Sequence, residues 1–177
     1  MKWSKKMSSN ELPAWYALYT MPQCEKKVAR LLLRYRIEFY LPLVRKQRKW
    51  SDRIKLVDFP LFPGYVFVLI PFYTKRYAVL NLPGALKFVE IEGRPASVQE
   101  EEMDSLRMIV SAAQDVQAHP EKNFPVGQKV IVRSGALKGV RGEIVKIKNQ
   151  VRLFVKLEDC GLYASAEIDA ADVEKLD

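Results

Sequence analysis

The segment from residue 61 to residue 70 constrains the fold more than any other, because it is apolar on both faces of the strand that it predicts. It reads Leu-Phe-Pro-Gly-Tyr-Val-Phe-Val-Leu-Ile, a Pro-Gly turn followed by a run without a polar residue. Side chains alternate along a strand, so one face carries Tyr65, Phe67 and Leu69, and the other carries Val66, Val68 and Ile70. An antiparallel sheet usually leaves one face to water. Either helices cover both faces, or the aromatic face docks another protein, and the pattern alone supports both equally.

The rest of the amino-terminal half predicts a small α+β sandwich built around this strand. Residues 15–20 form a β-rich run, and residues 24–35 have helical spacing with Val28, Leu31, Leu32 and Tyr35 as the core stripe. Residues 37–42 predict a strand, and residues 45–57 predict a basic hairpin that turns near Ser51-Asp52. A short helix at 75–80, a strand at 85–91 and a helix at 99–110 complete the domain, the last introduced by a capping box at Ser97-Val-Gln-Glu100.

The carboxy-terminal part has a different texture. Residues 112–124 are polar and predict a connector, and residues 125–177 contain several short strands at close turn spacing. Such a pattern predicts a small β barrel. We therefore expect an amino-terminal domain over 13–111, a linker over 112–124 and a second domain over 125–177.

The positive charge of the chain is concentrated in its first third. Residues 1–60 hold 14 Lys and Arg against 5 Asp and Glu, whereas residues 61–177 hold 15 against 16. A local basic field attracts polyanions, and the abundant intracellular polyanion is nucleic acid. The distribution therefore favours a nucleic-acid partner.

Residues suited to covalent catalysis are few. The single histidine, His119, lies in a polar stretch, and this context predicts that it is a solvated linker residue. The acidic run from Glu100 to Asp104 fits the first turn of a helix better than a metal site, and Cys24 and Cys160 have no partners at metal spacing. We expect no enzyme, metal or cofactor, no membrane segment or secretory signal, and a cytoplasmic monomer.

Three motifs together resemble the NusG family of bacterial transcription elongation factors. They are Trp15-Tyr16 at the first strand, Phe62-Pro-Gly-Tyr-Val-Phe-Val68 after a basic hairpin, and Val126-Gly127 followed by Ser134-Gly-Ala-Leu-Lys-Gly-Val-Arg-Gly142. The resemblance covers nearly everything from Trp15 to Leu176. It implies an amino-terminal domain like the family's NGN domain, followed by an SH3-like KOW barrel.

The resemblance also implies partners and site residues. The family's first domain binds the clamp helices of RNA polymerase through an apolar surface. Such a surface would explain why the predicted strand is apolar on both faces. By motif, it corresponds here to Tyr19, Phe62, Tyr65 and Phe67. Binding in the family suppresses pausing by bridging the DNA channel. We expect Phe67→Asp to abolish polymerase binding without unfolding the domain.

Basic residues in two segments match the part of the family's first domain that faces the upstream fork and the non-template DNA strand. On the first helix these are Lys27, Arg30 and Arg34. On the hairpin they are Arg45, Lys46, Arg48 and Lys49. These hairpin residues would contact DNA or polymerase, or they would only form a solvated face, and the sequence favours neither interpretation. Phosphate contacts would be independent of base sequence and sensitive to salt.

Within the family, the sequence is more similar to the RfaH-like and UpxY-like antiterminators of polysaccharide operons than to the housekeeping factor. Asp159-Cys160 stands where the housekeeping KOW tip carries bulky residues for ribosomal protein S10 or Rho, which leaves Leu137 and Val140 as apolar contacts for such partners. The KOW barrel could rest on the aromatic surface or tumble freely. The alternative function is a general nucleic-acid or ribosome-associated KOW protein.

Overall fold

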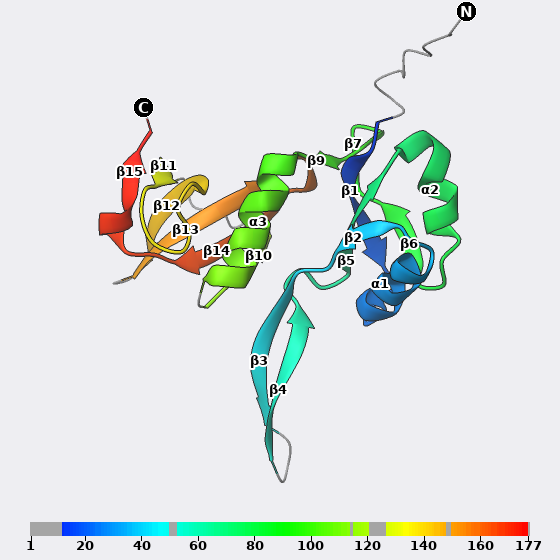
Figure 1. The fold of residues 1–177 in the computed structure, drawn as a ribbon, viewed down its shortest axis with the longest axis horizontal. Helices are drawn as coiled ribbons and strands as arrows, with labels where there is room; N and C mark the ends of the chain where they lie inside the picture. The colour runs from blue at the N-terminus through cyan, green and yellow to red at the C-terminus, as the bar shows by residue number, and fades with distance from the viewer. Residues whose placement is uncertain (1–11, 50–52, 114, 121–126, 148–149, 177) are drawn as a thin grey trace, which may run out of the picture. The chain divides into compact units, whose positions relative to one another are not determined.

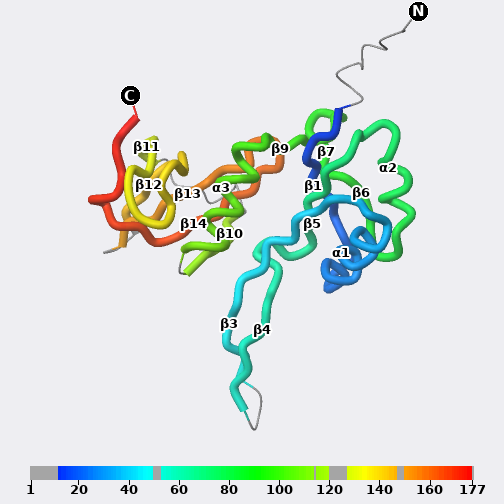
Figure 2. The backbone as a smooth tube through the Cα atoms, viewed as in Figure 1, coloured from blue at the N-terminus to red at the C-terminus, as the bar shows by residue number. Residues whose placement is uncertain are grey.

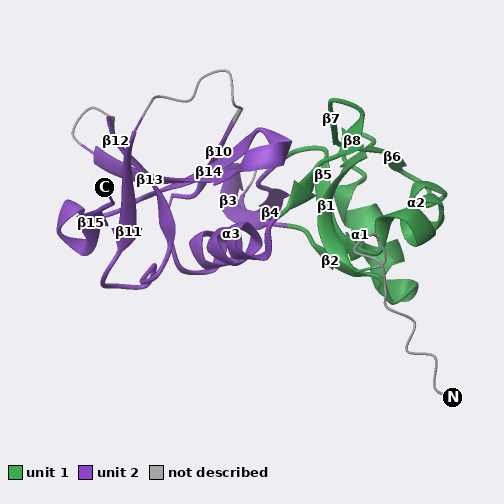
Figure 3. Cartoon of the chain, turned by 90° about the horizontal axis from the view of Figure 1, so that it is seen from above, with its two compact units in different colours: residues 1–41, 63–98 green, residues 42–62, 99–177 purple. Residues whose placement is uncertain are grey.

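The structure is a computed structural model that describes residues 12–49, 53–113, 115–120, 127–147 and 150–176 (Figure 1). The chain divides into two compact units, the first made of residues 1–41 and 63–98 and the second of residues 42–62 and 99–177 (Figure 3). Each unit has its own antiparallel sheet, so the expectation of a mixed α and β chain with antiparallel sheets in both parts is confirmed.

The first unit is built on a five-stranded antiparallel sheet. Its strands are β1 (Ala14–Thr20), β2 (Glu38–Tyr40), β5 (Tyr65–Ile70), β6 (Ala85–Phe88) and β9 (Ser97–Val98). The order is β2-β5-β1-β6, and β9 also pairs with β1. The two long central strands run antiparallel in a register that places Tyr19 opposite Tyr65 and Ala14 opposite Ile70. A separate two-stranded ribbon joins β7 (Glu90–Ile91) to β8 (Arg94–Pro95).

Both helices of the first unit pack on the valine face of the sheet. The helices are α1 (Glu25–Arg34) and α2 (Phe72–Leu80), and they share one hydrophobic core with the strands. That core contains Val66, Val68 and Ile70 from β5, so helices cover this face of the doubly apolar strand. The aromatic face of β5 lies on the opposite side of the same strand.

The core stripe of α1 ends at Leu32, three residues before the Tyr35 that its spacing predicts. Val28 and Leu32 are fully buried and Leu31 is half-buried, but the Tyr35 side chain is 61% exposed. Tyr35 is the C-cap of the helix, and the next residue, Arg36, has a left-handed backbone with φ 56°. The chain therefore turns away from the helix before Tyr35 can reach the core.

The hairpin of the second unit is a long two-stranded ribbon, visible in Figure 2. Strand β3 (Leu43–Lys49) pairs with β4 (Ile54–Pro60), from Leu43 opposite Pro60 to Lys49 opposite Ile54. The basic hairpin is thus confirmed, while its expected turn at Ser51-Asp52 lies outside the described residues.

The remaining strands of the second unit form a six-stranded antiparallel sheet. They are β10 (Gln117–Pro120), β11 (Gln128–Val132), β12 (Arg141–Ile147), β13 (Gln150–Leu157), β14 (Leu162–Glu167) and β15 (Val173–Lys175). Their order is β10-β14-β13-β12-β11-β15, with short 3-10 turns at Glu158–Cys160 and Ala170–Asp172. This is the sheet that was expected as a small barrel, and we call it the carboxy-terminal sheet.

Strand β10 differs from the irregular connector expected over residues 112–124. Its residues Gln117–Pro120 pair with β14, from Gln117 opposite Ser165 to Pro120 opposite Leu162. The preference of a polar segment for a loop is overridden here, because the edge of β14 supplies main-chain partners. The part of the connector from 121 to 124 lies outside the described residues.

Helix α3 (Glu100–Ala112) packs against β13 and β14 and buries Met103, Leu106 and Ile109. The capping box that introduces it is formed by Gln99 and Glu102, so the prediction of a box at Ser97–Glu100 is wrong by two residues. The backbone N–H of Gln99 donates to Glu102 Oε2 at 3.0 Å. Ser97 cannot act as the cap because it belongs to β9 and pairs with Tyr16 of β1.

Candidate protein and nucleic-acid interfaces

The aromatic face of the first sheet carries a close pair of tyrosines. Tyr19 of β1 and Tyr65 of β5 lie directly opposite each other, with ring centroids 4.5 Å apart and hydroxyl oxygens joined by a 2.6 Å hydrogen bond. Both side chains are half-buried, and the Lys87 Nζ atom lies 5.7 Å from the centroid of the Tyr19 ring. The pair therefore offers apolar ring surface, two hydroxyls and a nearby cation.

The other two aromatics predicted for docking are in the interior. Phe67 has no exposed surface and Phe62 is 2% exposed, and Phe62 falls in the second unit. Phe67→Asp would place a carboxylate in a fully buried site, so the burial of Phe67 argues against the expectation that this substitution leaves the fold intact. Of the predicted set, the structure leaves Tyr19 and Tyr65 partly accessible.

A buried carboxylate fixes the turn from which Tyr65 projects. Glu25, in the first turn of α1, is 5% exposed, and its Oε1 atom accepts a 2.7 Å hydrogen bond from the Gly64 N–H. The Thr20 N–H donates to the Gly64 carbonyl at 2.8 Å, and Gly64 has φ 85°, a conformation that glycine adopts without strain. Sequence reasoning missed Glu25, although an acid at a helix start was the available signal.

The basic residues predicted on α1 form one exposed row. Lys27, Arg30 and Arg34 lie at spacings of three and four residues, and all three are exposed. Arg30 also donates from Nε to the Lys26 carbonyl at 3.3 Å. This row can meet an extended polyanion along one side of the helix.

The hairpin residues predicted to bind nucleic acid are also exposed, but they do not share one face. Lys46 and Arg48 project from the side of the ribbon opposite to that of Arg45 and Lys49, because successive side chains alternate. Arg45 Nε donates to Asp58 Oδ1 at 3.0 Å, so an acid neutralises part of its charge.

The apolar residues predicted as partner contacts on the second unit lie inside it. Leu137 is 6% exposed and Val140 is 1% exposed. The backbone of this loop returns to β11 through hydrogen bonds between Val132 and both Val140 and Gly139, which turns the apolar side chains inward. In this conformation neither residue presents a contact surface.

His119 is not the solvated linker residue that its sequence context predicts. Its side chain is half-buried, its Nε2 atom lies 2.8 Å from Ser165 Oγ, and its ring lies 5.0 Å from the Phe154 ring. Burial lowers the pKa of His119, and the nearby Arg152 guanidinium lowers it further. In the same unit, burial raises the pKa of the Cys160 thiol to about 12, so that thiol stays protonated and unreactive.

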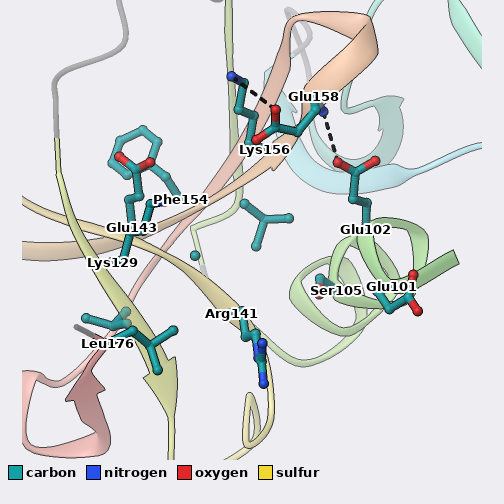
Figure 4. A pocket seen from close by; sticks show the side chains of 13 residues that line it. Glu101, Glu102, Ser105, Lys129, Arg141, Glu143, Phe154, Lys156, Glu158 and Leu176 are labelled. Atoms are coloured by element: carbon teal, nitrogen blue, oxygen red, sulfur yellow. Dashed lines mark hydrogen bonds and ion pairs between the residues drawn. The ribbon is translucent and has the colours of Figure 1, made fainter. Parts of the chain in front are cut away.

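A pocket of about 310 Å³ lies beside α3 in the second unit (Figure 4). Acidic side chains including Glu102 and Glu158 and basic ones including Lys129 and Lys156 line it. The Glu158 N–H donates to Glu102 Oε1 at 3.1 Å, and Lys156 Nζ lies 3.8 Å from Glu158 Oε2. The residues described along its wall include no histidine or cysteine.

Two other kinds of site are missing from the part of the chain that the structure describes. No group of three or more His, Cys, Asp or Glu residues there is arranged to hold a metal ion. No described helix has both the length and the apolar character needed to cross a membrane.

Comparisons with known proteins indicate one family. The family profile described as "Transcription termination factor nusG" matches residues 13–107. The transcription termination/antitermination protein NusG of Rickettsia bellii is 23% identical over 96% of this chain and 94% of its own length. The protein of the same name from Staphylococcus carnosus is 26% identical over 92% of this chain and 95% of its own length.

Among solved structures, one described as "Domain interaction in Thermotoga maritima NusG" has a similar fold. It is 23% identical, covers 96% of this chain and 100% of its own, and has a TM-score of 0.55.

Proposed function

Because the chain belongs to the NusG family of transcription termination and antitermination factors, we propose that its first unit binds RNA polymerase through Tyr19 and Tyr65. The observation that carries this proposal is the accessible tyrosine pair. Its rings are held in place by cross-strand pairing and by the Glu25–Gly64 hydrogen bond. Tyrosine anchors on a rigid strand lose little conformational freedom on binding and can desolvate a large area. The partner surface is the coiled-coil clamp of the polymerase, and the effect is processive elongation without covalent chemistry.

The basic row on α1 gives this factor a second contact. Lys27, Arg30 and Arg34 would meet the phosphates of the non-template DNA strand near the docked polymerase. Contacts to phosphate position a protein but do not read sequence. Selection of an operon would then come from another feature of the transcribed DNA or RNA.

We further propose that the carboxy-terminal sheet is a KOW module that closes as an SH3-like barrel and serves an operon-specific, polysaccharide-type antiterminator. Support comes from the tip between β13 and β14, where Asp159 is exposed and the Cys160 thiol is largely buried. With Leu137 and Val140 also buried, this face offers little apolar area to ribosomal protein S10 or Rho. Binding of either partner is expected to be weak.

The polymerase contact can be tested with a matched pair of double variants. In a binding assay with core RNA polymerase and with an isolated clamp-helix fragment, Tyr19→Ala/Tyr65→Ala should lower the affinity about 30-fold or more. The control is Tyr73→Ala/Tyr77→Ala, which removes two exposed tyrosines, 55% and 62% exposed, from α2 of the same unit. It should leave affinity for the clamp-helix fragment unchanged.

Unchanged binding by a folded Tyr19→Ala/Tyr65→Ala protein would refute the proposed docking surface. Loss of binding only when Lys27, Arg30 and Arg34 are neutralised would instead favour the general nucleic-acid-binding function.

A further inference from the structure

The β3–β4 hairpin segregates its charges between its two faces. Residues opposite each other in the ladder share a face, so the register from Leu43–Pro60 to Lys49–Ile54 assigns every described side chain of the ribbon to one side or the other. We call the side of Lys46 the cationic face. Within the ladder it carries Lys46, Arg48 and Lys55 and no acid. Asp115, on another segment of the same unit, lies within electrostatic reach of Lys46 at the base of this face.

The opposite side has a different character. It carries Lys49 and the Arg45–Asp58 ion pair, together with Gln47 and two exposed aliphatic side chains, Ile54 and Leu56. Ile54 is 63% exposed and Leu56 is 65% exposed. We call it the aliphatic face. Two faces of one ribbon therefore differ strongly in net charge although both are exposed.

The arrangement of the cationic face works against folding of the isolated hairpin. Arg48 lies directly opposite Lys55, and like charges at directly opposed positions destabilise a sheet. Along one strand, Lys46 and Arg48 are two residues apart, which is about 7 Å in an extended chain. Closely spaced cations of this kind match a ligand that carries regularly spaced negative charge.

We propose that the cationic face of the hairpin binds the phosphodiester backbone of a nucleic acid, and that the aliphatic face does not. This refines the nucleic-acid contact of the proposed function by naming the face and the chemical group that it recognises. Lysine and arginine side chains on this ribbon approach phosphates as point charges and forks, without reaching a defined base edge. The contact is therefore independent of base sequence and dependent on salt.

The test compares two double variants that remove equal charge from opposite faces. Binding of the full chain to a fluorescent DNA duplex of mixed sequence is measured over a series of salt concentrations. The measurement is repeated with the same sequence as single-stranded DNA and as an RNA duplex, and comparing the three affinities identifies the kind of nucleic acid that is bound. Lys46→Gln/Lys55→Gln should lower the slope of log affinity against log salt by about 2, since each lost contact contributes about 0.9 on duplex DNA. At about 0.1 M salt this corresponds to about 60-fold weaker binding.

The matched control is Arg45→Gln/Lys49→Gln, which takes the same formal charge from the aliphatic face. Its slope should stay within about 0.5 of the wild-type value. Ile54→Ser/Leu56→Ser should leave the affinity unchanged. Equal losses of affinity in the two charge variants would show a general electrostatic field and overturn the assignment to one face. The assignment would also be overturned if the wild-type chain did not bind the duplex, or if Ile54→Ser/Leu56→Ser abolished binding.

Two further measurements keep the outcomes separate. Thermal unfolding of all three variants checks that the hairpin changes leave the rest of the chain folded. Binding of Lys46→Gln/Lys55→Gln to the clamp-helix fragment should equal that of the wild type, because this assay contains no nucleic acid. A failure of the hairpin proposal would then leave the tyrosine docking surface standing, and the reverse also holds.

Discussion

Arg152 and Asp115 are joined through both the side chain and the main chain of the aspartate. The Arg152 side chain is 4% exposed, its Nη1 atom donates to Asp115 Oδ2 at 2.8 Å, and its Nη2 atom donates to the Asp115 carbonyl at 2.7 Å. Asp115 has φ 49°, which turns the chain into β10 two residues later. A buried guanidinium on β13 thus holds the segment that was expected to be a free linker.

The first prediction concerns the hydrogen bonds of this guanidinium. Arg152 also donates to the Ser165 hydroxyl at 3.1 Å and to the Ser165 carbonyl at 3.3 Å. Arg152→Met keeps much of the apolar stem but removes the guanidinium donors from the fully buried Ser165 and from Asp115, and should lower the free energy of unfolding by about 2 kcal/mol. Denaturant unfolding followed by circular dichroism measures this change.

Asp115→Asn serves as the control for the Arg152 variant. The Asp115 side chain is 54% exposed, so solvent screens its charge and the loss should stay below about 1 kcal/mol. Hydrogen exchange should show faster exchange of the β10 amides in Arg152→Met than in Asp115→Asn. Equal protection of β10 in wild type and Arg152→Met would show that the strand does not depend on the guanidinium.

The second prediction is a pH dependence that arises from His119. Burial and Arg152 lower the pKa of His119 in the folded chain below its unfolded value of about 6.5, so the unfolded chain binds the proton more tightly. The stability that neutral His119 provides is therefore complete above about pH 6.5 and decreases as the pH falls through the folded-state pKa. Protonation would place a second cation beside the Arg152 guanidinium.

Urea unfolding between about pH 8 and about pH 5 tests this sign against His119→Gln, which cannot titrate. The wild type should lose more stability than the variant over that range. Asp115 contributes only at lower pH, because the hydrogen bonds from Gln117 and Arg152 hold its pKa below the usual range of an aspartate. Parallel pH profiles of the two proteins would contradict the prediction.

The third prediction concerns the carboxylate that holds the turn before β5. Glu25→Ala leaves the Gly64 N–H without its acceptor and should lower the free energy of unfolding of the first unit by about 2 kcal/mol. Glu25→Gln retains an acceptor oxygen at the same reach and should cost about half as much. Chemical denaturation measures the free energy of unfolding of both variants, and a binding assay on the folded protein measures their affinity for the clamp-helix fragment.

If Glu25 acts only on stability, both folded variants will bind the clamp-helix fragment as tightly as the wild type. If it also positions Tyr65, Glu25→Ala will bind more weakly than Glu25→Gln. Equal stability of Glu25→Ala and the wild type would show that the turn is fixed without this hydrogen bond.

The sequence by itself determined the elements whose signal is local. A continuous apolar run after the Pro63-Gly64 turn identified β5, helical spacing identified α1, and the two basic runs around Ser51-Asp52 identified the β3–β4 ribbon. Three motifs together, one of them around Pro63-Gly64, indicated the family. Each of these signals lies within a few residues, because backbone preference and side-chain alternation are set by neighbours along the chain.

Only the tertiary structure decided which side chains are accessible and which polar segments are ordered. It buried Phe67 while leaving Tyr65 half-buried, exposed Tyr35 at the end of α1, and made β10 a strand by pairing it with β14. Burial and pairing depend on residues far away in the sequence, so no local pattern specifies them.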